Sequence, residues 1–261
     1  MLLAVLLVAL TACDSVELTQ ENIQDVIQAN QELRTVTDQT KITMTLEAQG
    51  MRMPIELDSQ GVVNYETQQA QGTMNVQAFF MQEKTEYYFE EGTLYVYQDG
   101  TWSQEETEEG FAEMDLNAAT KLLEESSVNI TREEKDDTNY YRVQAEVNQE
   151  YLLEILLGEM DAESVELLGK QEENPIREYS VSYLIHPRTL YIEEMSIQAH
   201  IVLTDEQTGD VNIEVETLGT YSQHNQPVNI QRPEGIEEAN TQPSFAKSNT
   251  ITGAAISQVR T

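Results

Sequence analysis

The sequence predicts an α+β protein built on an antiparallel β-sheet, and two features of its hydropathy pattern indicate this class. Apolar and polar residues alternate with a period of two over many stretches, which is typical of strands that bury one face. Runs of such strands follow one another and are separated by a few helix-like stretches, without the regular strand–helix alternation of parallel sheets. The helices are therefore expected to gather on one side of the sheet.

The first third of the chain predicts one helix and then several strands. Residues 19–33 place their apolar residues near one helical face. From residue 41 the period changes to two, which predicts strands at 41–48, 53–58 and 74–80. Pro54 lies within the second of these strands, and because proline lacks an N–H donor it indicates an edge strand or a bulge.

The middle third predicts a hairpin, two helices and two strands, at residues 93–102, 113–125, 127–132, 139–147 and 148–158. The turn of the hairpin is Asp99-Gly100, a pair that favours a tight reversal. The helix at 148–158 is apolar over more than one face, so we expect it to be well buried. A further helical turn or two is expected at 161–169.

The last third predicts three strands, at 179–185, 195–201 and 211–215, joined by short polar loops. Residues 239–261 contain no acidic residue and few large apolar ones, which indicates a disordered tail. One folded domain is therefore expected over residues 19–238.

The N-terminus indicates a lipoprotein leader. Residues 1–12 form an apolar run that is too short to span a membrane and has the small-residue ending of a signal peptide. Leu10-Thr11-Ala12-Cys13 resembles the bacterial lipobox, which implies that Cys13 is acylated, that 13–18 is a tether, and that the membrane is a partner. Cys13 is the only cysteine of the chain, and acylation would account for an otherwise free thiol in an exported protein. The predicted location is the outer face of the cell membrane.

The charge of the chain excludes one class of function. The 261 residues include 47 acidic and 14 basic ones, which gives a formal net charge of −33. The basic residues are scattered singly, so the chain lacks the basic stripe that binds phosphate groups. Nucleic acid is therefore not a predicted partner.

No catalytic, metal or cofactor site is predicted. The three histidines, His186, His200 and His224, lie in no metalloprotease or nucleophile-elbow motif. The acidic clusters at 105–109 and 133–137 lack the alternating spacing of a calcium loop, so we interpret them as solvated loop charge. The chain is predicted not to be an enzyme.

The order of these elements is similar to that of the LolA-like and LppX-like bacterial envelope lipoproteins, and most to a Gram-positive branch of mostly unknown function. The segments that carry the resemblance are YYFEEGTLYVYQDGTW (87–102) and YLIHPRTLYIEEMSIQAHI (183–201). The resemblance covers about residues 19–238. It implies a strongly curved half-barrel sheet with helices over its concave apolar face, and a hollow that carries lipid or acyl chains.

The predicted lining of that hollow consists of methionine, aromatic and leucine side chains on apolar faces: Met44, Met53, Met74, Phe80, Leu152, Leu156, Tyr183 and Met195. Methionine adapts to irregular ligands, which favours a cavity. An ordinary core leaves the same period-two pattern. Two functions therefore stay open: a lipoprotein that binds a lipid or other apolar ligand, and a structural or protein-interaction module of the envelope with a solid core.

Overall fold

The structure is a computed structural model that describes residues 17–78, 81–106, 116–124, 126–157, 174–205 and 209–241. Cys13 and the predicted leader lie outside these residues. The described helices are η1 (Gln20–Asn22), α1 (Ile23–Gln31), α2 (Leu116–Glu124), α3 (Gln149–Leu157) and η3 (Ile236–Glu238). None of them is long and apolar enough to cross a membrane.

The strands form one sheet in the order β12-β6-β5-β4-β3-β2-β1-β11-β10-β9-β8-β7. Their bounds are β1 (Thr35–Ala48), β2 (Met51–Asn64), β3 (Gln69–Ala78), β4 (Met81–Glu90), β5 (Thr93–Gln98), β6 (Thr101–Glu106), β7 (Ser127–Lys135), β8 (Thr138–Glu146), β9 (Ile176–Ile185), β10 (Ile192–Asp205), β11 (Gly209–Ser222) and β12 (Asn240–Thr241). All pairs are antiparallel except β12 with β6.

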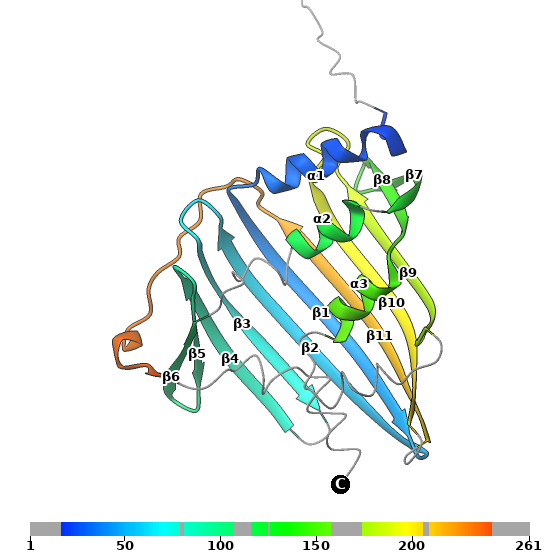
Figure 1. The fold of residues 1–261 in the computed structure, drawn as a ribbon. Coiled ribbons are helices and arrows are strands. Elements are labelled where there is room, and N and C mark those ends of the chain that lie inside the picture. Colours follow the sequence, from blue (N-terminus) through cyan, green and yellow to red (C-terminus); the bar gives the residue numbers. More distant parts are fainter. Residues whose placement is uncertain are drawn as a thin grey trace, which may run out of the picture.

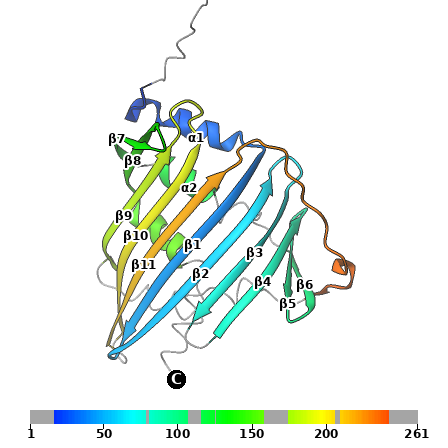
Figure 2. The same ribbon diagram turned by 180° about the vertical axis from the view of Figure 1, so that it is seen from behind.

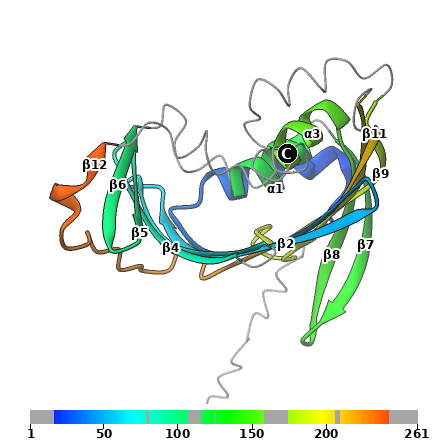
Figure 3. The ribbon, with the colours of Figure 1, turned by 90° about the horizontal axis from the view of Figure 1, so that it is seen from below.

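The sheet is strongly curved, and α1, α2 and α3 lie on its concave side (Figures 1 and 3). The predicted α+β class and the half-barrel shape are confirmed. The central seam joins β1 to β11, so that Met44 lies opposite Val215. On either side of this seam the strands pair in sequence order, and most of the pairs are hairpins, whereas the segment that contains α3 joins β8 to β9 (Figure 2).

Alternation along the strands separates a buried concave face from a more exposed convex face. On β1, Val36, Met44 and Leu46 are buried on the concave side. On the convex side, Lys41 and Glu47 are exposed. Most of the apolar core therefore lies between the concave face and the helices.

The polar contacts of two buried side chains, Asn30 and Tyr183, fix helices to the sheet. The buried Asn30 of α1 donates from Nδ2 to the carbonyl of Leu190 and accepts at Oδ1 from the N–H of Ile192, at 3.0 Å each. The hydroxyl of Tyr183 on β9 donates to the carbonyl of Ala119 in α2, at 3.1 Å. Because these partners are buried, losing either contact would leave a polar group unsatisfied.

The C-terminal segment, residues 223–241, returns across the convex face (Figures 2 and 3). The N–H of Gln231 donates to Gln71 Oε1 at 3.2 Å, and Arg232 forms an ion pair with Glu90 at 3.5 Å. Two residues, Asn240 and Thr241, then pair with β6. Order thus extends three residues beyond position 238, the predicted end of the domain, and residues 242–261 of the predicted tail lie outside the described chain.

Most elements agree with the sequence predictions, but the strands are longer. The first strand begins at Thr35 and not at residue 41. The strand that contains Pro54 is not an edge strand, because β2 lies between β1 and β3. Pairing with β3 starts only at Ile55, however, so Pro54 itself is opposite Thr45 of β1 and has no registered partner on β3. The predicted turns at 161–169 lie outside the described residues.

Candidate functional site

The helix α3 presents apolar side chains that are only partly covered. Asn148 caps its N-terminus, since Asn148 Oδ1 accepts hydrogen bonds from the N–H groups of Glu150 (2.8 Å) and Tyr151 (3.3 Å). Leu152 is fully buried, whereas three further side chains are half-buried: Leu153, Ile155 and Leu156. The helix is therefore less buried than its apolar composition predicts.

The concave face of the sheet carries a matching half-buried apolar group, which we call the apolar floor: Ile42 of β1 and Met74, Val76 and Ala78 of β3. These side chains are neighbours across the ladder, because Leu57 of β2 pairs with both Ile42 and Val76. The described helices α2 and α3 lie over β1, β11 and β10 (Figure 1). The part of the face on β3 is thus partly accessible.

The structure places all of the predicted lining residues that it describes on the concave face or on α3. Met44, Met53, Leu152, Tyr183 and Met195 are buried in the core. Two of the predicted residues, Met74 and Leu156, are half-buried and belong to the accessible set. Phe80 lies outside the described residues.

One row across the sheet joins three of the predicted residues. It runs over six strands as Met74, Ser59, Thr40, Gly219, Met195 and Tyr183. Burial raises the pKa of the Tyr183 hydroxyl far above its ordinary range. Tyr183 is therefore a neutral donor to α2 and belongs to the solid part of the core.

A second row on the same face is polar, and sequence reasoning missed it. We call it the polar row: Tyr87, Gly72, Gly61, Asp38 and Tyr221, taken in order from β4 to β11. Asp38 has the same strand parity as Met44 and Leu46, so it points to the concave side. Extending the period-two pattern backwards from Ile42 would have placed Asp38 on the concave face, as an acidic residue at a position where apolar residues are expected.

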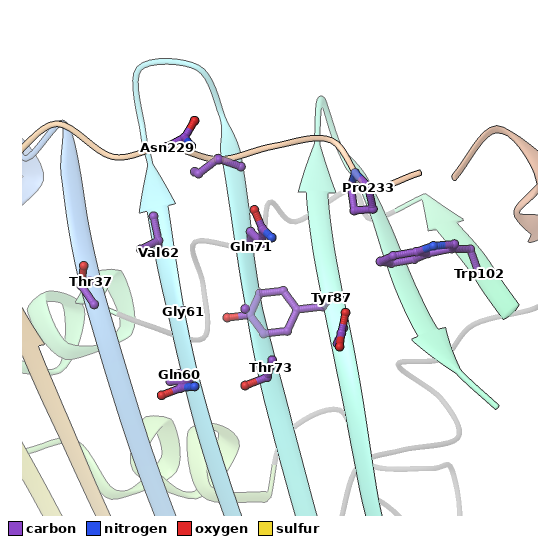
Figure 4. A pocket seen from close by; sticks show the side chains of 13 residues that line it. Thr37, Gln60, Gly61, Val62, Gln71, Thr73, Tyr87, Trp102, Asn229 and Pro233 are labelled. Atoms are coloured by element: carbon purple, nitrogen blue, oxygen red, sulfur yellow. The ribbon is translucent and has the colours of Figure 1, made fainter. Parts of the chain in front are cut away.

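The two glycines of the polar row make room for the Tyr87 ring. A Cβ atom on Gly72 would overlap this ring, and a Cβ on Gly61 would overlap its hydroxyl. The ring lies across β3 with its hydroxyl toward Gly61 (Figure 4). The same Cβ position on Gly61 is 3.0 Å from Asp38 Oδ1, so the hydroxyl and the carboxylate adjoin one point on β2.

Asp38 is a buried acid without a counter-charge. Its side chain is 7% exposed, and its Oδ1 has no hydrogen-bond partner. None of the ion pairs between described residues includes it. Burial raises the pKa of the Asp38 carboxyl, and a hydrogen bond with its own backbone opposes this only in part.

The convex face carries a pocket of about 500 Å³ under the C-terminal segment, and Gly61, Gly72 and Tyr87 of the polar row are among its lining residues. Its lining includes Gln60, Gln71, Trp102, Asn229 and Pro233 (Figure 4). Alternation puts Gln60 and Gln71 on the side opposite the apolar floor. Polar and apolar residues both line the pocket, which lies on the convex side and is not the predicted hollow.

The histidines make local contacts. His186 Nδ1 accepts from two backbone N–H groups of its own turn, at 3.3 Å each. His224 lies 3.1 Å from the carbonyl of Ile192 and stacks on Tyr191, and burial lowers its pKa. In the described part of the chain, no group of three or more metal-binding side chains could hold an ion.

Comparison with a family model decides the classification. A model described as a family of unknown function, DUF6612, matches residues 19–241. The chain belongs to this DUF6612 family. No match was found among curated proteins.

Several solved structures resemble this DUF6612 chain. LprF from Mycobacterium bovis has a TM-score of 0.46 and 16% identity, over 83% of this chain and 97% of that one. A LolA superfamily protein from Nitrosomonas europaea has a TM-score of 0.27 and 9% identity, over 82% and 96%. A putative outer membrane lipoprotein-sorting domain from Vibrio parahaemolyticus has a TM-score of 0.25 and 8% identity, over 80% and 93%. The LolA-like group that the sequence resembles is thus represented among them.

Proposed function

We propose that this DUF6612 protein is a non-catalytic envelope lipoprotein that binds a lipid or another apolar ligand between α3 and the concave face of the sheet. The observation that carries the proposal is the half-buried state of the apolar floor and of Leu153, Ile155 and Leu156. Apolar surface inside the concave face is in contact with water. Each ligand methylene buried against it would contribute about 0.8 kcal/mol to the free energy of binding.

Membrane anchoring is the second part of the proposal. The lipobox-like Leu10-Thr11-Ala12-Cys13 supports a diacylglyceryl group on Cys13 and removal of residues 1–12. Two acyl chains give stable attachment where one gives only marginal binding. The envelope surface of a bacterium, in keeping with the Gram-positive branch that the sequence resembles, is then the site of action.

Labelling with radioactive palmitate in the native host tests the anchor. The wild-type chain should carry label and sediment with membranes, and Cys13→Ala should lose both. A Cys13→Ala chain that keeps its label would overturn the anchoring proposal.

Native mass spectrometry of the protein purified from its own membrane tests the ligand. The intact chain should carry an adduct of lipid mass. In solution, the uncharged dye N-phenylnaphthylamine should bind to the wild type and bind more weakly to Met74→Gln and Val76→Gln, because each places an amide on the apolar floor. Leu218→Gln is the matched control, since Leu218 is apolar, 43% exposed and on the convex face.

The second candidate function is a structural or interaction module with a solid core. It is favoured by the completely buried side chains on the helix-covered strands, such as Val143, Ile201 and Ile213. Absence of both a lipid adduct and dye binding would support this candidate and end the carrier proposal.

A further inference from the structure

Polarity changes in one direction along three neighbouring strands of the concave face. From the polar row toward the turn between β1 and β2, the concave residues of β1 are Asp38, Thr40, Ile42 and Met44. Those of β2 change in the same way, from Gly61 and Ser59 to Leu57, and those of β3 from Gly72 to Met74, Val76 and Ala78. The register keeps these positions side by side, so a polar end continues into the apolar floor.

The length of this path suits an extended chain. Gly72 of the polar row and Ala78 of the apolar floor are six residues apart on β3, which corresponds to about 20 Å at the rise of a β-strand. Met74 and Val76 lie between them and are half-buried. A single hydrocarbon chain laid along β3 would therefore contact the apolar floor while its head lies at the polar row.

Asp38 determines which head would be stable there. An anionic head would meet a carboxylate that forms no ion pair with a described residue. A hydrogen-bond-donating head would instead satisfy Asp38 Oδ1, the buried oxygen that lacks a partner. Hydrogen bonds to a charged group contribute about 1.5–3 kcal/mol, which corresponds to about ten- to hundredfold in affinity.

We infer that the polar row is a head-group site, at which Asp38 Oδ1 accepts a hydrogen bond from the ammonium or hydroxyl of a single-chain amphiphile. The inference rests on the proposed function, because it assigns the polar end of the same ligand. Gly61 and Gly72 leave room for the Tyr87 ring, which brings its hydroxyl to the same point on β2 as Asp38 Oδ1. A buried acid without a partner costs folding free energy, and such costs are characteristic of binding sites.

The test is displacement of N-phenylnaphthylamine from the intact protein by hexadecylamine, hexadecanol and palmitate, which share one chain and differ in the head. In the wild type, hexadecylamine and hexadecanol should displace the dye at about tenfold lower concentration than palmitate. Asp38→Asn removes the charge and keeps a carbonyl acceptor. It should therefore weaken the binding of hexadecylamine by about tenfold and the binding of hexadecanol much less. Asp38→Leu removes the acceptor as well and should weaken the binding of both hexadecylamine and hexadecanol.

Asp58→Asn is the matched control, because Asp58 is an exposed acid on the convex side of β2. It should leave all three displacements unchanged. Tyr87→Phe removes only the hydroxyl beside Asp38 and should reduce the preference for the donating heads by a smaller factor. Melting curves recorded for each variant show whether it is folded under the conditions of the displacement experiment.

Three results overturn the inference. If the three amphiphiles displace the dye alike in the wild type and in Asp38→Asn, the head-group site is wrong while the proposed function stands. If palmitate binds best, the site prefers an anionic head, and the preference for a hydrogen-bond-donating head is wrong. If neither the dye nor any amphiphile binds to the wild type, the proposed function fails and the head-group site fails with it.

Discussion

The helix-covered half of the sheet and the half around β3 have the same sequence pattern but different packing. On β8, β10 and β11 the concave side chains Val143, Ile197 and Ile213 are at most 1% exposed. On β3 the concave Met74 and Val76 are half-buried, and Met81 of β4 is 60% exposed. Period-two alternation therefore identifies the inner face of a sheet, whereas the helices above it decide whether that face is core or accessible surface.

This difference separates the two candidate functions physically. Side chains in the covered half are held by neighbours on all sides, as in an ordinary interior. Side chains of the apolar floor retain contact with solvent, so a ligand can replace water there without displacing protein. Variants in the two halves of the sheet are therefore expected to differ in their effects.

Methionine truncation should show the largest difference between the halves. Met44 is 3% exposed, so Met44→Ala should cost about 2–5 kcal/mol of unfolding free energy, because a cavity remains. Met74→Ala, at a half-buried site, should cost less than about 1 kcal/mol. Urea unfolding of both variants measures this. Equal costs would mean that the apolar floor is part of the solid core.

Glycine substitution should show that the tight packing in the accessible half is the packing of the Tyr87 ring against the glycines of the polar row. Gly61→Ala places a Cβ onto the hydroxyl of the Tyr87 ring and should cost about 1–3 kcal/mol. In a Tyr87→Ala background the same change should cost clearly less, since the overlapping ring is absent. A double-mutant cycle by chemical denaturation gives the coupling. Coupling near zero would contradict the placement of the ring.

Tyr183→Phe tests the attachment of α2 to the covered half. The variant removes the hydroxyl that donates to the carbonyl of Ala119 and should cost about 1–1.5 kcal/mol. Tyr179→Phe is a suitable comparison, because its hydroxyl also donates to a backbone carbonyl, that of Val147, at 3.3 Å, but is only part-buried. Equal losses would indicate that burial of the Tyr183 contact adds nothing.

Asp38→Asn should have the smallest effect on stability and the opposite sign. Burial raises the Asp38 pKa in the folded state, so unfolding free energy falls as pH rises from about 3.9, the unfolded value, through the raised folded value. At neutral pH the folded wild type carries a desolvation penalty that is absent at low pH, so the variant should be more stable at neutral pH by about 1 kcal/mol. The gain should disappear near pH 3. Denaturation at both pH values measures it; a gain that persists at low pH would exclude titration of Asp38 as the cause.

Local signals allowed much of the fold to be predicted from the sequence. Asp99-Gly100 turns the hairpin between β5 and β6, with φ of 51° and 86°. Asn148 caps α3 as its position indicates. Such features depend on neighbours in the chain, so one sequence contains the information that they need.

The site depended on information that one sequence does not contain. Asp38, Gly61, Gly72 and Tyr87 are far apart in the chain, and only the register of four strands makes them neighbours. The extent of helix cover over Met44 and Met74 likewise depends on tertiary packing. The predicted lining therefore combined core residues, such as Tyr183, with residues of the accessible face.

The seam between β1 and β11 also has a kinetic consequence. On each side of the seam the strands pair in sequence order and mostly as hairpins, so that most of their contacts are local and can form early. The pairing of Met44 with Val215 closes a loop that contains most of the chain, at a large entropic cost. We therefore expect this pairing to limit the folding rate, so that the two halves form first as separate sheets and the concave face becomes continuous only when residues 209–222 dock beside β1.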